Sequence, residues 1–280
     1  MYLDHWSLTL PPFEPAPDSR FLFLAPSGEL ALAAMSYVVG NGGGEPVLLC
    51  GEAGCGKTLL LRALRRQLPA EHCRVAFVPD MAAAQTSLLE RVAYHLTRER
   101  PAGNGAAIAA ITEALGEAER ERRTVVLMLD DWPAAAPQTS YDELRWLLDC
   151  DISDTRPCVL MSSEDSHVVK EWPRWMRQRL FTVAAVEPLT EDQVPRYLAH
   201  RLRIAGGPAE LFTPDAARRI AAWSGGVPRL INRVAHLALH VAYLDLARRI
   251  ETGSVERAIA RVAAREPRAA GAAATLGAEA

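Results

Sequence analysis

Short continuous apolar runs alternate with amphipathic stretches through the first part of the chain. A run of about four to eight apolar residues bounded by polar ones is typical of a strand that is buried on both faces. The expected strands cover residues 46–50, 74–78, 125–129, 157–161 and 181–186, and the expected helices cover residues 27–39, 85–96 and 106–121. Such alternation is typical of βαβ units with right-handed crossovers. The pattern therefore predicts an α/β fold with a parallel five-stranded sheet flanked by helices.

Only helical patterns follow after about residue 187. A Ser or Thr three residues before Glu or Gln forms a capping box, and Thr before Pro is a cap followed by a proline at the first helical position. The helix starts are Thr190 with Gln193, Thr213 with Pro214, and Pro228, and a fourth helix is expected over residues 254–264. The pattern predicts a small all-α domain after the sheet.

Composition and charge exclude several classes of protein. No apolar run approaches the length of about eighteen residues that spans a bilayer, and the N-terminus lacks a basic-then-apolar export pattern. We therefore expect a cytoplasmic location. The five cysteines occur singly, which favours neither a disulfide framework nor a zinc site. The net charge of −3 argues against a surface that binds nucleic acid all over, although a local basic patch stays open.

The segment from Gly51 to Thr58 matches the phosphate-binding pattern G-x-x-x-x-G-K-[ST] between an expected strand and an expected helix. Its glycines can turn backbone N–H groups toward phosphate oxygens at the positive end of the helix. Lys57 is then placed for the β- and γ-phosphates, and the Thr58 hydroxyl for Mg²⁺. We expect ATP to contact Gly51, Glu52, Ala53, Gly54, Cys55, Gly56, Lys57, Thr58 and Leu59.

Two adjacent acids, Asp130 and Asp131, end the most apolar of the expected strands. In an open α/β sheet, ligands bind beyond the carboxyl ends of the strands. Asp130 is expected to hold the Mg²⁺ shell, and Asp131 is expected to polarise the attacking water.

Two further segments carry a resemblance to a known family. They are the opening residues, with Met1–His5, Pro11–Phe13 and Pro17–Leu22, and the block Ser224–Asn232. Together with the phosphate loop, they resemble the AAA+ ATPases of the ExeA/GspA type, which are similar to transposition ATPases of the TnsC/TniB type. The similarity extends from Met1 to about residue 265.

The resemblance implies roles for residues outside the loop. Arg229 matches the sensor 2 arginine of the helical lid, and Arg179 matches the position of an arginine finger that acts in a neighbouring subunit. Arg174 and Arg177 are alternatives for the finger. The two serines at 162 and 163 occupy the sensor 1 region, and of these Ser163 is assigned to the site.

The order of the expected elements and the composition of the tail divide the chain into four parts. Residues 1–45 are expected to pack on the ATPase core, residues 46–188 to form the nucleotide-binding domain, residues 189–266 to form the lid, and residues 267–280 to be a disordered tail. Gly40–Gly44 breaks the chain before the first strand.

The sequence shows two departures from the family pattern. Asp131 stands where the family usually has glutamate, which shortens the carboxylate side chain by one methylene. A misplacement of roughly 1 Å can cost about a hundredfold in rate, so slow hydrolysis is one hypothesis. Trp132-Pro133 replaces the small and amide residues that usually follow the acids.

Three functions follow from these observations. The first is an ATP-hydrolysing AAA+ protein that forms a homo-oligomer with nucleotide, as a ring or a filament, and remodels a secretion or envelope assembly, reaching the inner membrane only through a partner protein. The second is a regulator of transposition, or of another mobile element, that binds duplex DNA. The third is a nucleotide switch that hydrolyses ATP slowly.

Overall fold

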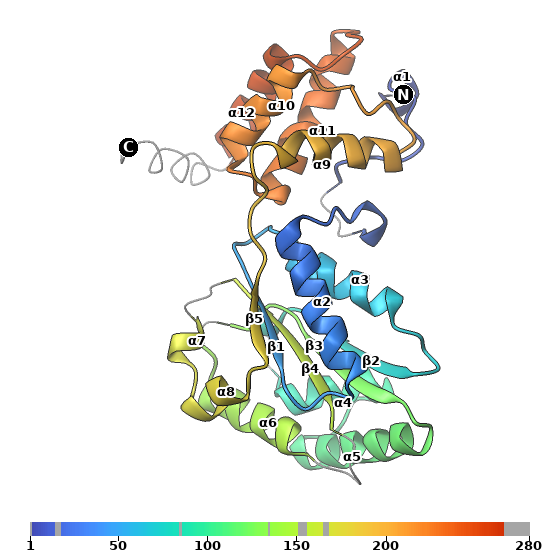
Figure 1. Cartoon of the computed structure of the whole chain (residues 1–280), viewed down its shortest axis with the longest axis vertical. Coiled ribbons are helices and arrows are strands. Elements are labelled where there is room, and N and C mark those ends of the chain that lie inside the picture. Colours follow the sequence, from blue (N-terminus) through green and yellow to red (C-terminus); the bar gives the residue numbers. More distant parts are fainter. Residues whose placement is uncertain are drawn as a thin grey trace. The chain divides into compact units, whose positions relative to one another are not determined.

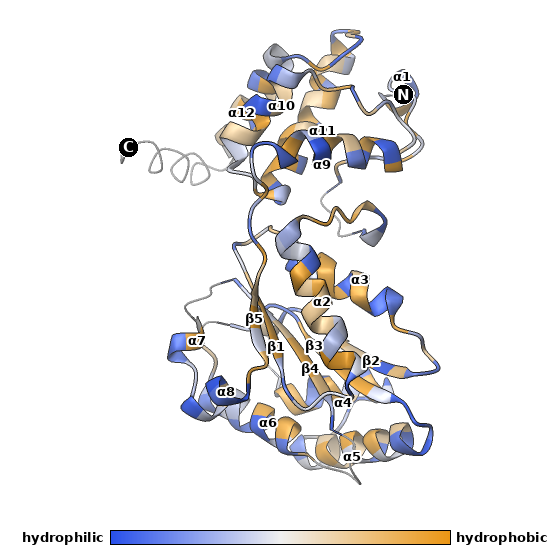
Figure 2. Ribbon diagram, viewed as in Figure 1, coloured by the Kyte–Doolittle hydropathy of each residue, from blue (hydrophilic) through white to orange (hydrophobic). Residues whose placement is uncertain are grey.

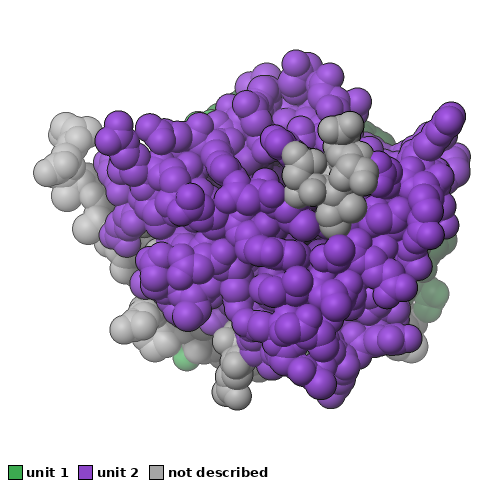
Figure 3. Space-filling model, turned by 90° about the horizontal axis from the view of Figure 1, so that it is seen from below, with its two compact units in different colours: residues 1–25, 54–56, 187–280 green, residues 26–53, 57–186 purple. Residues whose placement is uncertain are grey.

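The computed structural model describes residues 2–14, 18–83, 86–133, 135–150, 156–164 and 168–265 (Figure 1). Its chain forms two compact units, which Figure 3 distinguishes by colour. An α/β unit contains residues 26–53 and 57–186, and a helical unit contains residues 1–25, 54–56 and 187–280. Each unit is described by itself below.

The α/β unit is built on a parallel five-stranded sheet, as the apolar pattern predicts. Its strands are β1 (Val47–Cys50), β2 (Cys73–Val78), β3 (Thr124–Leu129), β4 (Cys158–Ser163) and β5 (Thr182–Ala185). They are arranged in the order β2-β3-β4-β1-β5. The register pairs Leu129 at the end of β3 with Met161 of β4. The segments that follow β3 therefore lie beside the end of β4.

Helices cover the sheet and join its strands. They are α2 (Pro26–Gly40), α3 (Lys57–Gln67), α4 (Leu88–Thr97), α5 (Asn104–Arg120), α6 (Gln138–Asp149), α7 (Val168–Glu171) and α8 (Arg174–Arg179), with a 3-10 turn η2 (Met81–Ala83). The helix expected from residue 85 begins three residues later, because the Ser87 side chain caps it by accepting from the N–H of Glu90. Residue 85 itself lies outside the described residues. Helices α6, α7 and α8 are additional to the helices expected from the sequence.

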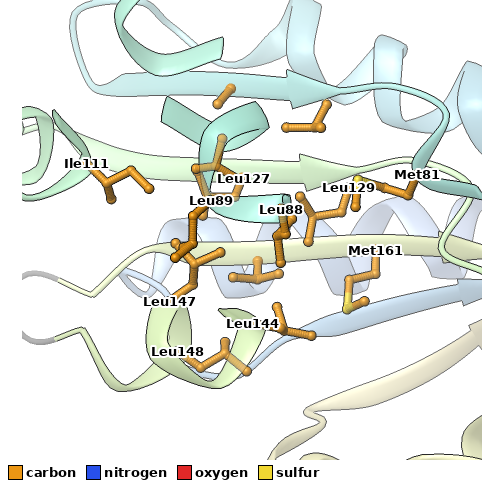
Figure 4. Close-up of a cluster of buried hydrophobic side chains, with 14 of the residues drawn as sticks. Met81, Leu88, Leu89, Ile111, Leu127, Leu129, Leu144, Leu147, Leu148 and Met161 are labelled. Carbon is orange, nitrogen blue, oxygen red and sulfur yellow. The ribbon is translucent and has the colours of Figure 1, made fainter. Parts of the chain in front are cut away.

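One large apolar cluster lies between the sheet and helices α4, α5 and α6. Leu88, Leu89, Ile111, Leu144 and Leu147 are all buried in it (Figure 4). Each of these three helices buries an apolar stripe, and Figure 2 shows apolar residues beside polar ones on α5 and α6. The burial of these apolar stripes fixes the helices against the sheet.

The helical unit contains α1 (Tyr2–His5), a 3-10 turn η1 (Ser19–Phe21), α9 (Gln193–Ile204), α10 (Pro214–Ser224), α11 (Pro228–Leu244) and α12 (Thr252–Arg265). The expected cap of α10 is present, since the Thr213 side chain accepts from the N–H of Ala216. Only half of the expected capping box forms at α9. The Gln193 side chain accepts from the N–H of Thr190, but the Thr190 hydroxyl donates to Asp192.

The opening segment packs differently from the expectation that residues 1–45 lie as one piece on the ATPase core. Trp6, Leu8, Phe13 and Phe21 are buried in the apolar core of the helical unit. The structure therefore divides the segment at residue 26, where α2 begins and joins the α/β unit. Large aromatic side chains explain the difference, because they fill the space beside α9 and α11. Residues 267–280, for which disorder is predicted, lie outside the described residues.

None of the helices in the described part of the chain is both long enough and apolar enough to cross a membrane.

Candidate nucleotide-binding site

The phosphate loop connects β1 to α3, and its glycines meet specific backbone demands. Gly54 and Gly56 have φ angles of 94° and 105°, which favour glycine over residues with a side chain. A Cβ atom on Gly51 would lie 2.2 Å from the carbonyl oxygen of Val186. These positions require glycine for the conformation and close packing of the loop, independently of any ligand.

Lys57 begins α3 and is buried, with 5% of its surface exposed. Its Nζ donates to the carbonyl oxygen of Gly51 at 2.7 Å and to that of Glu52 at 3.2 Å. The ammonium group therefore bonds to the carbonyls of its own loop. It has three N–H donors, so it can turn toward a phosphate oxygen without losing every bond to the loop.

The next residue, Thr58, meets the first acid of the strand-end pair. Its hydroxyl donates to Oδ1 of Asp130 at 3.1 Å, across 72 positions of sequence. Asp130 is buried, and its backbone is fixed because its N–H donates to the carbonyl of Val78. A hydroxyl and a carboxylate side by side are the oxygen donors that Mg²⁺ accepts. The residues present thus fit the metal ion that the sequence predicts here.

Asp130 and Asp131 share a further partner, Ser162. The Ser162 hydroxyl donates to Oδ1 of Asp130 at 2.6 Å and accepts from the N–H of Asp131 at 2.9 Å. Ser163, the residue expected in the site from the family resemblance, is also buried at the end of β4. In the parallel pairing of β3 and β4, Leu129 lies opposite Met161. The next residues of the two strands, Asp130 and Ser162, therefore come beside each other, and this register could have indicated Ser162.

Asp131 has a left-handed backbone conformation, with a φ of 57°. Aspartate and asparagine adopt this conformation more readily than residues with longer side chains, which is a physical reason for Asp in place of Glu. Burial raises the pKa of its carboxyl group, and Asp130, Glu164 and Asp80 raise that pKa further, while Lys57 opposes them. The free protein therefore disfavours a negative charge on Asp131.

Replacing Asp131 by Asn is expected to raise the melting temperature of the free protein by a few degrees near pH 7. Asn tolerates the same backbone and removes the disfavoured charge. Because the folded pKa is raised, the unfolded chain releases this proton first as the pH rises. The wild type then loses stability from about pH 4 up to the folded pKa. Thermal unfolding measured across this pH range should show that the higher melting temperature of Asp131→Asn disappears below about pH 4.

Glu113→Gln is the matched control, because Glu113 is an exposed acid of α5 and is not one of the site residues. Glu113→Gln should leave the melting temperature unchanged both near pH 7 and below about pH 4. If Asp131→Asn raises the melting temperature by the same amount below about pH 4 as near pH 7, the electrostatic explanation is ruled out.

Arg179, the expected arginine finger, lies at the end of α8. It forms an ion pair with Asp149 at the end of α6, and its guanidinium lies 6.0 Å from the centre of the Trp175 ring. Its side chain is 39% exposed. The ion pair and the ring contact of Arg179 are thus with α6 and α8, and neither involves the two acids that follow β3. Arg174 and Arg177, the alternatives, are both exposed.

Arg229 is the second residue of α11, which begins with Pro228 as predicted. Gly225 and Gly226 precede it with φ angles of 56° and 79°, and a Cβ on Gly226 would lie 1.8 Å from the carbonyl oxygen of Leu189. The N–H of Arg229 donates to the carbonyl of Gly54, which belongs to the same compact unit, at 3.3 Å. The glycine pair therefore allows the tight turn from which α11 starts.

The loop, the paired acids and the parallel sheet with β1 between β4 and β5 define a P-loop nucleoside triphosphatase of the AAA+ class. Residues 41–164 match the family described as AAA domain. The fold resembles Cdc6p of Pyrobaculum aerophilum, which is 20% identical with a TM-score of 0.66, over 83% of this chain and 68% of that one. RuvB of Thermotoga maritima, described as a Holliday junction branch migration motor, is 19% identical with a TM-score of 0.58, over 85% of this chain and 69% of that one.

Within this class, the chain is similar to the AAA+ proteins of the general secretion pathway protein A type. It is 31% identical over 265 residues to General secretion pathway protein A of Aeromonas hydrophila. The match covers 92% of this chain and 48% of the relative, so the chain spans about half the length of that protein. The family resemblance seen in the opening and lid segments is confirmed.

Proposed function

We propose that this protein binds and hydrolyses ATP with Mg²⁺ and assembles with nucleotide into a homo-oligomer that remodels or regulates a secretion-associated assembly. The observation that carries the ATPase part is the hydrogen bond between Thr58 and Asp130, which joins the phosphate loop to the acidic strand end. A Gly-rich turn that matched the motif by chance would have no reason to meet an acid 72 positions away.

Each residue of the site has a role that follows from its chemistry. Lys57 binds the β- and γ-phosphates as a point charge, and the backbone of the loop cradles them. Thr58 and Asp130 would hold Mg²⁺, which neutralises charge on the phosphates when it is bound. Asp131 accepts a hydrogen bond from the attacking water, and its raised pKa brings it closer to neutral pH as a base.

Two arginines would complete the site. Arg229 follows the glycine turn of the helical unit, and we assign it to the γ-phosphate as the lid residue that couples hydrolysis to movement. Arg179 would act in trans, because a planar guanidinium stabilises the charge of a phosphoryl transition state. Its ion pair with Asp149 would then have to open when a neighbouring subunit docks. The active form is accordingly the oligomer.

The similarity to General secretion pathway protein A supports a secretion-associated partner. The ORC1 protein of Aeropyrum pernix, whose structure was solved in complex with DNA, has a similar fold at 18% identity and a TM-score of 0.66, over 86% of this chain and 67% of that one. At 18% identity, this likeness shows a similar fold, and it motivates a test of DNA binding. We place the protein in the cytoplasm, where a partner would bring it to the inner membrane.

ATPase rate and particle size, each measured with and without ATP and duplex DNA at low and high salt, test the proposal. We expect Mg²⁺-dependent hydrolysis, growth of the particle with ATP, and no response to DNA. A rate that rises with DNA and falls steeply with salt would favour the DNA regulator instead, because phosphate contacts release counterions. Absence of ATP binding would exclude both functions.

A further inference from the structure

The two acids of the site are held by one side chain that is fully buried, Ser162. Its hydroxyl group is used in both directions. The O–H donates to Oδ1 of Asp130 at 2.6 Å, and the oxygen accepts from the N–H of Asp131 at 2.9 Å. One hydroxyl thus connects the residue expected to hold the metal ion with the residue expected to act on water.

The backbone of Ser162 adds a third bond to the same segment. Its carbonyl oxygen accepts from the N–H of Trp132 at 2.7 Å. Residues 130 to 132 are therefore all bonded to a single residue of β4. This matters because Asp131 has a left-handed backbone, and such a conformation persists only where the surrounding structure holds it.

Asp130 receives two hydroxyl donors on the same oxygen, Oδ1, from Thr58 and from Ser162. The two donors differ in what they can do next. Thr58 is expected to turn its oxygen to a metal ion, whereas Ser162 belongs to a buried strand and has no route to solvent. Ser162 alone can keep the Asp130 carboxylate oriented while the bond from Thr58 is exchanged.

We propose that Ser162 is a positioning residue, which orients the Asp130 carboxylate for Mg²⁺ and fixes the left-handed turn that aims Asp131 at the attacking water. This proposal rests on the proposed ATPase function, and it concerns no contact between Ser162 and the nucleotide. It differs from the sensor role that the family resemblance assigns to Ser163, since Ser162 acts through the two carboxylates.

The test compares Ser162→Ala with Ser162→Thr and the wild type, in the full chain. Ser162→Ala should lower kcat by about a hundredfold, the cost of a misplacement of roughly 1 Å. The Kd for ATP without Mg²⁺ should stay within about threefold, because Lys57 and the loop are untouched. The gain in ATP affinity that Mg²⁺ gives the wild type should be largely lost. Ser162→Thr, which keeps the hydroxyl, should restore a substantial part of both properties.

A readout that does not depend on activity is hydrogen exchange of the backbone amides in the free protein. Exchange at Asp131 should rise by at least about tenfold in Ser162→Ala, since its N–H loses its acceptor, and should stay near wild type in Ser162→Thr. The control is Ser254→Ala, which removes a buried serine hydroxyl at the start of α12 in the helical unit. It should change neither the rate nor this exchange.

The outcomes separate the two proposals. A wild type that neither binds nor hydrolyses ATP would overturn the proposed function, and with it the catalytic part of this inference. A folded Ser162→Ala protein that keeps the wild-type kcat, Mg²⁺ dependence and Asp131 exchange would overturn the positioning role while the ATPase stands. If Ser162→Ala and Ser162→Thr lower kcat and the Mg²⁺ dependence equally, the strand tolerates no change at residue 162. That result would also reject the role of the hydroxyl.

Discussion

A chain carrying Lys57→Ala is expected to bind ATP about a hundredfold more weakly than the wild type, and to lose any particle growth that depends on ATP. The substitution removes the one cation that the phosphate loop itself provides. A charge-assisted hydrogen bond contributes about 1.5–3 kcal/mol, and about 2.7 kcal/mol corresponds to a hundredfold in Kd. The loss should be largest for ATP and smallest for adenosine, because Lys57 is assigned to the terminal phosphates.

Isothermal titration calorimetry with ATP, ADP and adenosine measures this order directly. Arg65→Ala is the matched control, since Arg65 is an exposed cation in the last turn of the same helix, α3, whereas the loop lies at the first turn. It removes the same charge and should leave all three affinities unchanged. An unchanged ATP affinity in Lys57→Ala would contradict the assignment of this loop to phosphate binding.

A second consequence of Lys57→Ala concerns the free protein. In the absence of nucleotide, the ammonium group bonds to the carbonyls of Gly51 and Glu52. Without it these carbonyls lose their donor, although water can replace it wherever the loop is open. The melting temperature should therefore change much less than the affinity, which distinguishes a binding defect from a folding defect.

The features of this fold that could be predicted from sequence are those that neighbouring residues determine. Continuous apolar runs such as Val125–Leu129 are typical of buried strands, and the phosphate motif lies between one such strand and an amphipathic helix. Thr213 and Pro214 define a helix start within four residues. Each of these signals lies within a short window of sequence. The strands and helix starts that they predict are confirmed.

Features that depend on pairing between residues distant in sequence could not be predicted from a short window of the chain. The choice between Ser162 and Ser163 depends on which of them lies beside Asp130, and this follows only from the register of β3 and β4. The left-handed turn at Asp131 accompanies a hydrogen bond from its N–H to the hydroxyl of Ser162, which lies 31 positions away in the sequence. Helix α6 was missed, although Leu144, Leu147 and Leu148 are buried with helical spacing and could have indicated it.

The opening segment is the clearest case of a long-range effect. Its proline-rich sequence gives no local signal of where it packs. One buried cation in the helical unit explains its position, because Arg201 of α9 lies against it. The Arg201 side chain is only 5% exposed, its Nε donates to the carbonyl of Pro12 at 2.6 Å, and its guanidinium lies 4.8 Å from the centre of the Phe21 ring. None of the ion pairs formed among the described residues involves Arg201. Its charge is therefore balanced by a carbonyl, a hydroxyl and aromatic faces alone.

Replacing Arg201 by Ala is expected to lower the free energy of unfolding of the helical unit by about 3 kcal/mol and to release the opening segment. The substitution breaks the bond to Pro12, the bond from Nη1 to the Tyr197 hydroxyl at 2.8 Å, and the contacts with the Phe13 and Phe21 rings. Relief of a buried charge offsets part of this loss, which is why the estimate stays below the sum of the contacts. Denaturant unfolding measures the stability, and limited proteolysis measures how far cleavage between Pro12 and Phe21 is accelerated.

The control for this prediction is Arg203→Ala, which removes an exposed arginine two positions along α9 and should cost less than about 0.5 kcal/mol. Arg201→Lys discriminates further. A lysine keeps the charge and can reach one oxygen, but it lacks the planar group that lies against the rings, so it should recover less than half of the lost stability. If Arg201→Ala matches the wild type in both stability and cleavage, then the aromatic side chains of the opening segment hold it to the helical unit without the cation, because Trp6 and Phe13 are buried on their own account.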